Sequence, residues 1–197
     1  SYKIFESFLH MSTVELRELS HKDINSEFID WHNNEHAKNY SASKRTFTKE
    51  NLLDEYNNGI KNKNLYQYLV HHIKDRKNIG VIKIGPIDYL HKKSDLVVFI
   101  GDKNYLKQGL GSEAIKLGNL VAFNDLGIRK VHGPIIKSNI GAVKVYLKAN
   151  WVIEAILKGH YLVDGEEQDA ILVACYNPKY FSREICKTSK ITLEDVY

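Results

Sequence analysis

The sequence is poor in cysteine and proline, and it has no long uninterrupted hydrophobic run. Its 197 residues include two cysteines, three prolines and twelve glycines. Two isolated cysteines favour reduced cytosolic thiols over a disulfide framework, and so little proline and glycine excludes collagen-like and low-complexity chains. No stretch reaches the roughly 18 apolar residues that a membrane helix requires. We therefore expect a cytoplasmic protein with no membrane partner.

A strong charge of one sign is also lacking. Lys and Arg number 28 and Asp and Glu number 24, which gives a net charge of +4. The lysines are scattered and interrupted by acidic residues, whereas a nucleic-acid-binding protein usually shows a concentrated basic stripe. The composition therefore favours a small anionic ligand over nucleic acid.

The two ends of the chain differ in pattern from its middle. The apolar residues near the N-terminus are interrupted by Glu6 and Ser7, so they do not make a signal peptide. We expect residues 1–10 to be an N-terminal extension, either native or a cloning remnant, because the single methionine is Met11. Residues 11–178 would form one domain, and residues 179–197, which show little periodicity, would form a surface tail.

Strand-like and helix-like patterns alternate along the middle of the chain. We expect strands at Val14–Leu19, Leu65–Ile73, Ile79–Ile87, Asp95–Ile100, Lys130–Ile136, Trp151–Leu157 and Ala170–Tyr176. We expect four helices, one capped by Asp23, one from Thr48 to Gly59, one from Leu110 to Leu126 and one capped by Asn139. This mixture predicts a single α/β (α+β) domain. The fourth strand is apolar on both faces, which is typical of a central position.

The most distinctive segment is the loop before the long third helix, Gln108-Gly109-Leu110-Gly111-Ser112. Glycines expose backbone N–H groups, and a helix N-terminus carries partial positive charge, so this loop suits a pyrophosphate. The alternative is a tight turn that binds nothing. The spacing fits neither a dinucleotide-binding fingerprint nor a P-loop.

A second motif follows in order and gives the loop its context. It reads Asn139-Ile140-Gly141-Ala142 and then Tyr146-Leu147-Lys148-Ala149-Asn150-Trp151. Together the two motifs resemble those of the GNAT superfamily of acyl-CoA-dependent N-acyltransferases, over about residues 14–177. Two departures stand out, namely Leu106 in place of the usual Arg or Gln, and Asn150-Trp151 in place of Gly-Phe.

The resemblance implies a fold, a co-substrate and a set of roles. The fold would be a mixed, mostly antiparallel, twisted sheet of about seven strands, splayed at its centre. The co-substrate would be acetyl-CoA or another short-chain acyl-CoA, with no metal, and the protein would be a monomer or homodimer. Tyr146 would protonate the leaving thiolate, and a bulged strand at Val97–Ile100 would offer a backbone N–H to the thioester carbonyl. The expected cofactor-binding residues are Val98, Ile100, Lys107, Gln108, Gly109, Leu110, Gly111, Ser112, Asn139 and Lys144.

The base that accepts the amine proton is not evident from the sequence. Asp102 and His132 are the main candidates, and His91 and His160 are others. Each of these residues could instead be purely structural, and a water chain could do the same task.

The segment His32-Asn33-Asn34-Glu35-His36 formally matches an inverted zinc-protease motif. Paired asparagines are poor in a helix interior, and no third ligand is evident, so we do not favour zinc hydrolysis. By resemblance, Trp31 and Asn33 would instead wall the acceptor site. We expect His72 and His91 to line it as well, because their segments are rich in His, Asn, Lys and Tyr.

The acceptor is the least determined feature. The stretch from Ile79 to Lys103 resembles proteins that acylate nucleotide-linked amino sugars for surface polysaccharides, and scattered Lys and His would suit such an acceptor. We therefore expect an amino sugar nucleotide. The alternatives are a protein N-terminus or a small amine, and, less favoured, a non-catalytic acyl-CoA-binding domain.

Overall fold

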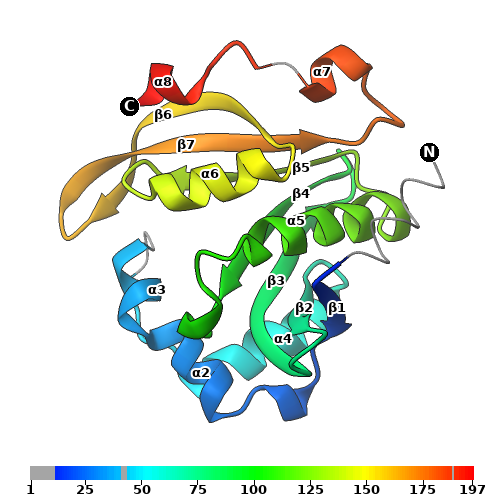
Figure 1. The fold of residues 1–197 in the computed structure, drawn as a ribbon, viewed down its shortest axis with the longest axis vertical. Coiled ribbons are helices and arrows are strands. Elements are labelled where there is room, and N and C mark those ends of the chain that lie inside the picture. The colour runs from blue at the N-terminus through cyan, green and yellow to red at the C-terminus, as the bar shows by residue number, and fades with distance from the viewer. Residues whose placement is uncertain (1–11, 41–43, 188) are drawn as a thin grey trace.

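A single seven-stranded sheet runs through the protein. The computed structural model describes residues 12–40, 44–187 and 189–197, so the expected extension at residues 1–10 lies outside them. The sheet order is β1-β2-β3-β4-β5-β7-β6, and every neighbouring pair is antiparallel except β4 and β5 (Figure 1). The strands are β1 (Val14–Glu18), β2 (Tyr66–His72), β3 (Lys77–Asp88), β4 (Lys93–Ile100), β5 (Lys130–Ile136), β6 (Val152–Val163) and β7 (Glu166–Tyr176).

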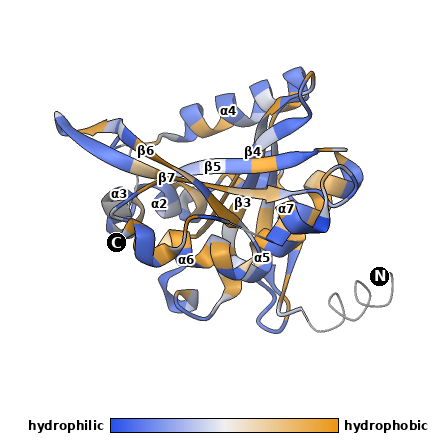
Figure 2. Ribbon diagram, turned by 90° about the horizontal axis from the view of Figure 1, so that it is seen from above, coloured by the Kyte–Doolittle hydropathy of each residue, from blue (hydrophilic) through white to orange (hydrophobic). Residues whose placement is uncertain are grey.

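Helices cover both faces of the sheet. They are α2 (Ser26–Asn33), α3 (Glu35–Tyr40), α4 (Lys49–Asn62), α5 (Leu110–Leu120), α6 (Ile140–Lys148), α7 (Arg183–Lys187) and α8 (Leu193–Val196), with short turns η1 (His21–Asp23), η2 (Lys103–Tyr105) and η3 (Val121–Asp125). In Figure 2, α4 lies on one side of the sheet and α5 and α6 lie on the other. No helix of the described residues is long and apolar enough to cross a membrane.

The hydrophobic core has two parts because the sheet separates the helices. The larger cluster packs α5 and α6 against Ile82, Leu96 and Val131. The smaller cluster packs α2 and α4 against the opposite face of the sheet, at Val81 and the partly buried Phe99.

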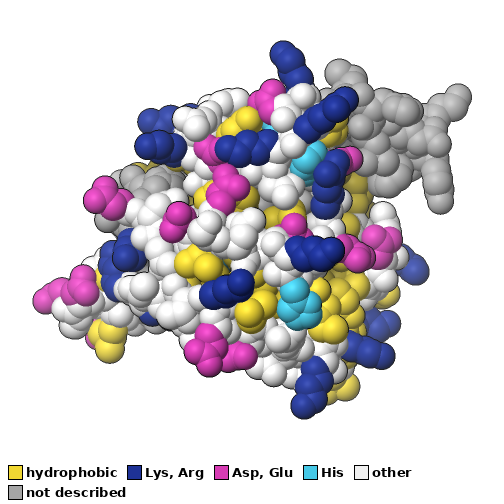
Figure 3. All heavy atoms as spheres, turned by 90° about the horizontal axis from the view of Figure 1, so that it is seen from below, with side chains coloured by type: hydrophobic (Ala, Val, Ile, Leu, Met, Phe, Trp, Pro, Cys, Tyr) yellow, Lys and Arg dark blue, Asp and Glu magenta, His cyan; other side chains and the backbone are white. Residues whose placement is uncertain are grey.

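On the face drawn in Figure 3, basic side chains are mixed with acidic ones rather than gathered into a stripe.

The predicted strands and the four long helices are present, but several boundaries differ. Helix α2 is capped by Asn25, whereas Asp23 closes a capping box in η1. Gly59 does not end α4, which continues to a left-handed Lys63; it is glycine because a Cβ there would lie 2.8 Å from the Leu65 carbonyl oxygen. Helix α5 is shorter than predicted because η3, a π-helical turn, replaces its last turn.

The C-terminal segment is not the loose surface tail that its weak periodicity suggested. Ile191 forms a bridge with Ile153 on β6. The Ser189 hydroxyl lies within hydrogen-bond distance of the carbonyl oxygens of both Ile153 and Ile191. Val196 is buried in the larger core cluster. The segment therefore packs as part of the domain, through contacts distant in sequence that a local pattern does not reveal.

The parallel pair β4–β5 is joined for only three residues. Lys93, Ser94 and Asp95 pair with Lys130, Val131 and His132, and beyond that point the two strands diverge. The splayed sheet centre that we predicted is therefore present. It leaves backbone groups of a central strand without a strand partner, and this gap positions the candidate site.

Candidate active site

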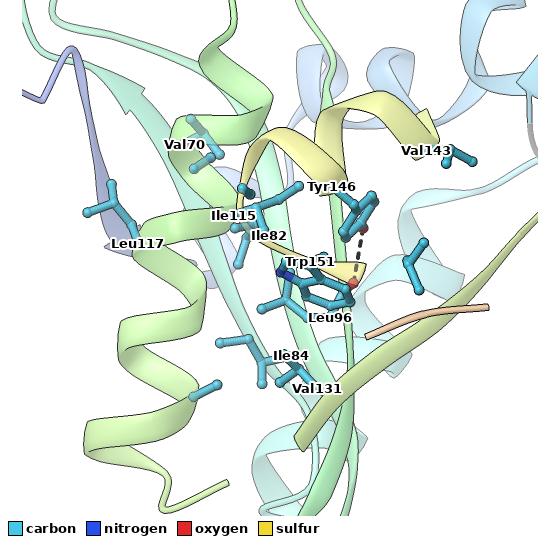
Figure 4. Close-up of a cluster of buried hydrophobic side chains, with 14 of the residues drawn as sticks. Val70, Ile82, Ile84, Leu96, Ile115, Leu117, Val131, Val143, Tyr146 and Trp151 are labelled. Carbon is cyan, nitrogen blue, oxygen red and sulfur yellow. Dashed lines mark hydrogen bonds between the residues drawn. The ribbon is translucent and has the colours of Figure 1, made fainter. Parts of the chain in front are cut away.

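The gap between β4 and β5 is occupied by the Tyr146 side chain from α6. Its hydroxyl donates to the Leu96 carbonyl oxygen at 3.0 Å (Figure 4). The same hydroxyl accepts from the Val98 N–H at 3.3 Å. Because backbone groups alternate in direction along a strand, the N–H of Ile100 is directed to the same side as that of Val98. A backbone donor and a phenolic hydroxyl thus meet at the splayed point.

The electrostatic environment keeps Tyr146 protonated. The ring is buried and packs edge-on against Trp151, with ring centroids 4.7 Å apart. Burial raises the pKa of its hydroxyl well above the ordinary value, since a phenolate would be poorly solvated there. Tyr146 therefore remains a proton donor at neutral pH.

No bulge is recorded in β4, although we predicted a bulged strand at Val97–Ile100. The irregularity lies in β3, between Ile84 and Ile87, opposite Leu96 and Ser94 of β4. The extra residue of this irregularity therefore belongs to β3 and not to β4. The outward N–H of Val98 arises from the loss of β5 pairing, not from a bulge.

The loop between β4 and α5 has the conformation expected of an anion-binding turn. Lys107 and Gly109 both have positive φ, at 61° and 81°, and Gly109 caps α5. Lys107, Gln108 and Gly109 are exposed, while the first N–H groups of α5, from Leu110 on, have no acceptor within the helix. N–H groups without an intrahelical acceptor at a helix start suit a pyrophosphate.

Several predicted cofactor-binding side chains already have intramolecular partners. Gln108 donates to the Asn104 carbonyl oxygen, and the Ser112 hydroxyl donates to the Val145 carbonyl oxygen at 2.8 Å. The Asn139 carboxamide accepts from the Ala142 N–H and caps α6. These contacts fix the loop and α6, so Gln108 and Ser112 would contribute mainly their backbone to a ligand. Lys144 is exposed on α6.

The sheet face away from α5 and α6 is left open around the splay. We call Asp95, Val97, His132 and Pro134 the open face; Val97 is 47% exposed although it lies in the middle strand of the sheet. The His132 Nδ1 lies 3.8 Å from an Asp95 carboxylate oxygen. An acid–base pair therefore lies where β4 and β5 separate.

The pair is partly desolvated, and this favours the neutral form of each group. Burial lowers the pKa of His132, an effect that the nearby Asp95 carboxylate opposes. Burial also raises the pKa of Asp95. A neutral imidazole can accept a proton from an amine.

The other candidate bases lie in different surroundings. Asp102 is buried, caps η2 and accepts from Lys77 at 2.6 Å. Burial alone would raise its pKa, but the Lys77 hydrogen bond and other donors hold it below the ordinary value, which makes it a weak base. His160 is exposed on β6 against Tyr161, and His91 lies in the exposed turn before β4.

The structure does not gather the predicted acceptor-wall residues into one pocket. His72 lies at the β2–β3 turn and His91 at the β3–β4 turn, so the twelve-residue strand β3, about 40 Å long, separates them. The Trp31 ring packs on Gly101, and the Asn33 carboxamide makes two 2.8 Å hydrogen bonds to the backbone of Phe47. Trp31 and Asn33 thus make contacts within the fold, and their role at the acceptor stays a prediction.

The zinc-like segment gives no metal site in the described part of the chain. His32 is buried among aromatic rings, and its Nδ1 is bonded to the Phe28 carbonyl oxygen. The His36 side chain lies outside the described residues. Among the residues that are described, no group of three His, Cys, Asp or Glu side chains could hold a metal ion.

Asp95 is the site residue that sequence reasoning missed. It lies at the start of an apolar strand, and nothing local connects it with His132, which is 37 positions later. The connection exists because α5 carries the chain back to a parallel strand beside β4. A polar residue beginning a central strand was the only available signal.

Comparison with known proteins identifies the family. The family model described as the acetyltransferase (GNAT) domain matches residues 13–152. Spermidine N(1)-acetyltransferase from Escherichia coli K12 is 23% identical over 131 residues, which cover 66% of this chain and 69% of that protein. The enzyme of the same name from Vibrio cholerae is 23% identical over 173 residues, covering 87% and 98%.

Solved structures agree on the fold. The crystal structure of spermidine N-acetyltransferase from Vibrio cholerae in complex with CoA and spermine superposes with a TM-score of 0.76 at 21% identity, covering 85% of this chain and 98% of that one. A further structure of the Vibrio cholerae enzyme is described as dodecameric, with a TM-score of 0.71 at 20% identity and coverage of 87% and 98%.

These findings correct the predicted acceptor and confirm the predicted family. The expected amino sugar nucleotide was wrong, because the relatives act on spermidine, and the small-amine alternative agrees better with them. The expected monomer or homodimer stays a prediction for this chain, while the Vibrio cholerae enzyme has a dodecameric form. The family match and the CoA-bound neighbour agree with the paired motifs. The chain belongs to the GNAT acetyltransferase family and is an acyl-CoA-dependent N-acyltransferase.

Proposed function

We propose that this protein transfers an acetyl group from acetyl-CoA to a primary amine of a small aliphatic polyamine, of the spermidine class. The observation that carries the proposal is the splayed β4–β5 gap, which places Tyr146 and the Val98 N–H beside the Asp95–His132 pair. The names of the relatives support the polyamine class.

The residues of the chain divide the task between the two sides of the sheet. Acetyl-CoA supplies an activated thioester, and its pyrophosphate suits the N–H groups at the start of α5. The Val98 N–H, which donates to the Tyr146 hydroxyl in this structure, would donate instead to the thioester carbonyl oxygen, and Tyr146 holds a proton for the leaving sulfur.

On the open face, His132 accepts the proton that the attacking amine loses. Its lowered pKa keeps the imidazole neutral at physiological pH, and Asp95 stabilises the cation once the proton has arrived. The exposed Val97, two residues along β4 from Asp95, suits the methylenes of an aliphatic amine.

The test is a rate comparison with acetyl-CoA across amine classes. We expect kcat/KM for spermidine, spermine or a linear diamine to exceed that for peptides with free N-termini or for aminoglycosides by about 100-fold, or about 2.7 kcal/mol. Efficient peptide acetylation without polyamine activity would contradict the proposal.

A further inference from the structure

A second polar group borders the open face. Lys83 on β3 and Glu55 on α4 form an ion pair whose side chains are 16% and 28% exposed. Lys83 pairs in register with Val97, so its side chain leaves the sheet on the same face. Val97 therefore separates two polar clusters, Asp95 with His132 on one side and Lys83 with Glu55 on the other.

An unsatisfied nitrogen lies within the electrostatic influence of this ion pair. His32 on α2 is only 7% exposed, and its Nε2 is buried without a hydrogen-bond partner in the described structure. Nδ1 is bonded to the Phe28 carbonyl oxygen at 2.8 Å, so it carries the hydrogen. Nε2 is then a bare acceptor, which needs a donor.

The surroundings of Nε2 indicate which kind of donor would fit. The His32 ring is lined by Phe28, Phe47 and Phe99, with centroids 4.7 to 5.3 Å away. Three charged groups influence its pKa, namely those of Lys83, Glu55 and Arg45. Arg45 is exposed and stacks over the Phe47 ring. A carboxylate, a bare imidazole nitrogen and aromatic faces together suit an ammonium group.

We propose that Glu55, with Nε2 of His32, receives the second ammonium of a diamine or polyamine acceptor while the reacting amine lies against Asp95 and His132. This inference rests on the proposed function. Asp95 is two residues away from Val97 on β4, and Lys83 lies opposite Val97 on the neighbouring strand. The spacings of a sheet then separate the Cα atoms of Asp95 and Lys83 by roughly 8 Å. The methylenes would lie over Val97, and Lys83 holds the Glu55 carboxylate when no diamine does.

The experiment compares two amines of equal length, 1,4-diaminobutane and n-butylamine, with acetyl-CoA as donor. In Glu55→Gln, kcat/KM for the diamine should fall at least about 10-fold through KM, while that for butylamine should stay within about twofold. Lys83→Met frees the carboxylate and should lower KM for the diamine. Glu50→Gln, in the exposed first turn of the same helix, is the matched control and should change neither amine.

Glu55→Gln leaves the Lys83 ammonium without its carboxylate, which lowers the stability of the fold. The double variant Glu55→Gln/Lys83→Met, in which both side chains are neutral, is therefore measured as well. It should melt cooperatively and show the same loss of diamine preference. The role of Glu55 would be overturned by an equal fall in kcat/KM for both amines in Glu55→Gln, by no change for either amine, or by a higher diamine KM in Lys83→Met. None of these results would contradict the proposed function. A wild-type protein that binds acetyl-CoA but acetylates no amine refutes the proposed function, and this inference with it.

Discussion

The hydroxyl of Tyr146 is held by β4 on two sides, through the Leu96 carbonyl oxygen and the Val98 N–H. Burial keeps it protonated, while a thiol ordinarily ionises near pH 8.5. We therefore expect Tyr146 to stabilise the leaving thiolate by donating a hydrogen bond to the sulfur as the carbon–sulfur bond breaks, without itself becoming a phenolate.

Replacing Tyr146 with Phe removes the proton donor and little else. We expect kcat to fall about 10- to 1,000-fold, with CoA affinity nearly unchanged. Single-turnover rates and CoA titration measure the two quantities. Tyr89→Phe, in the exposed β3–β4 turn, is the control and should behave as wild type. An unchanged rate for Tyr146→Phe, with chemistry rate-limiting, would remove Tyr146 from the mechanism.

His132 gives a pH dependence with a definite sign. It accepts a proton only when neutral, and its pKa is lowered from 6.5, chiefly by burial. At a fixed concentration of free amine, kcat/KM should be level at neutral pH and fall only below pH 6.5, as the imidazole becomes protonated. His132→Gln should lower kcat/KM about 100-fold and abolish this acid limb. Persistence of the limb in the variant would assign the proton transfer to another group.

At the scale of elements, a glycine at positive φ lies at each end of the helical segment that α5 and η3 form. It begins after Gly109 at φ 81°, and the segment that follows it ends at Gly127 at φ 64°. A Cβ at either glycine would meet no atom within 4 Å. An L-residue would be strained at either position, but only Gly109 adjoins the first N–H groups of α5.

The pair makes a matched test of the pyrophosphate site. Gly109→Ala and Gly127→Ala should each cost about 1 kcal/mol of stability, because an L-residue resists positive φ. Only Gly109→Ala should also weaken CoA binding, by about 10-fold or more, since its methyl group enters the space beside the N–H groups. Calorimetric titration and denaturant unfolding separate the two effects. Equal CoA affinity in both variants would exclude close approach at Gly109.

For the whole molecule, His32 links the smaller core cluster to pH. Burial lowers its pKa from 6.5 to about 4, so in this range the unfolded chain binds a proton that the folded protein does not. Stability should therefore be complete above pH 6.5 and fall by about 3 kcal/mol as the pH drops to 4.

The prediction is checked by urea unfolding between pH 4 and pH 7. His32→Leu should have a shallower dependence of stability on pH than wild type, because its side chain does not titrate. His91→Leu, in an exposed turn, should keep the wild-type slope. Equal slopes in all three proteins would show that His32 binds its proton equally well in the folded and unfolded states.

Local patterns determined most of the secondary structure and one half of the site. Strand alternation, the glycine loop and the Asn139–Tyr146 spacing depend on neighbours within a few residues, so the sequence was sufficient for the strands, the start of α5 and the placing of Tyr146 on α6. The same short range explains the boundary errors at Gly59 and Leu126, where a distant contact or a π turn decided the outcome.

The other half of the site was decided by tertiary structure alone. Asp95 meets His132 because a parallel strand returns after α5, and His72 and His91 part because β3 is long. Ser189, Ile191 and Val196 pack on β6 and the core although their own segment has little pattern. Each of these outcomes depends on contacts between residues far apart in the chain, which burial and strand pairing select only when the whole sheet forms.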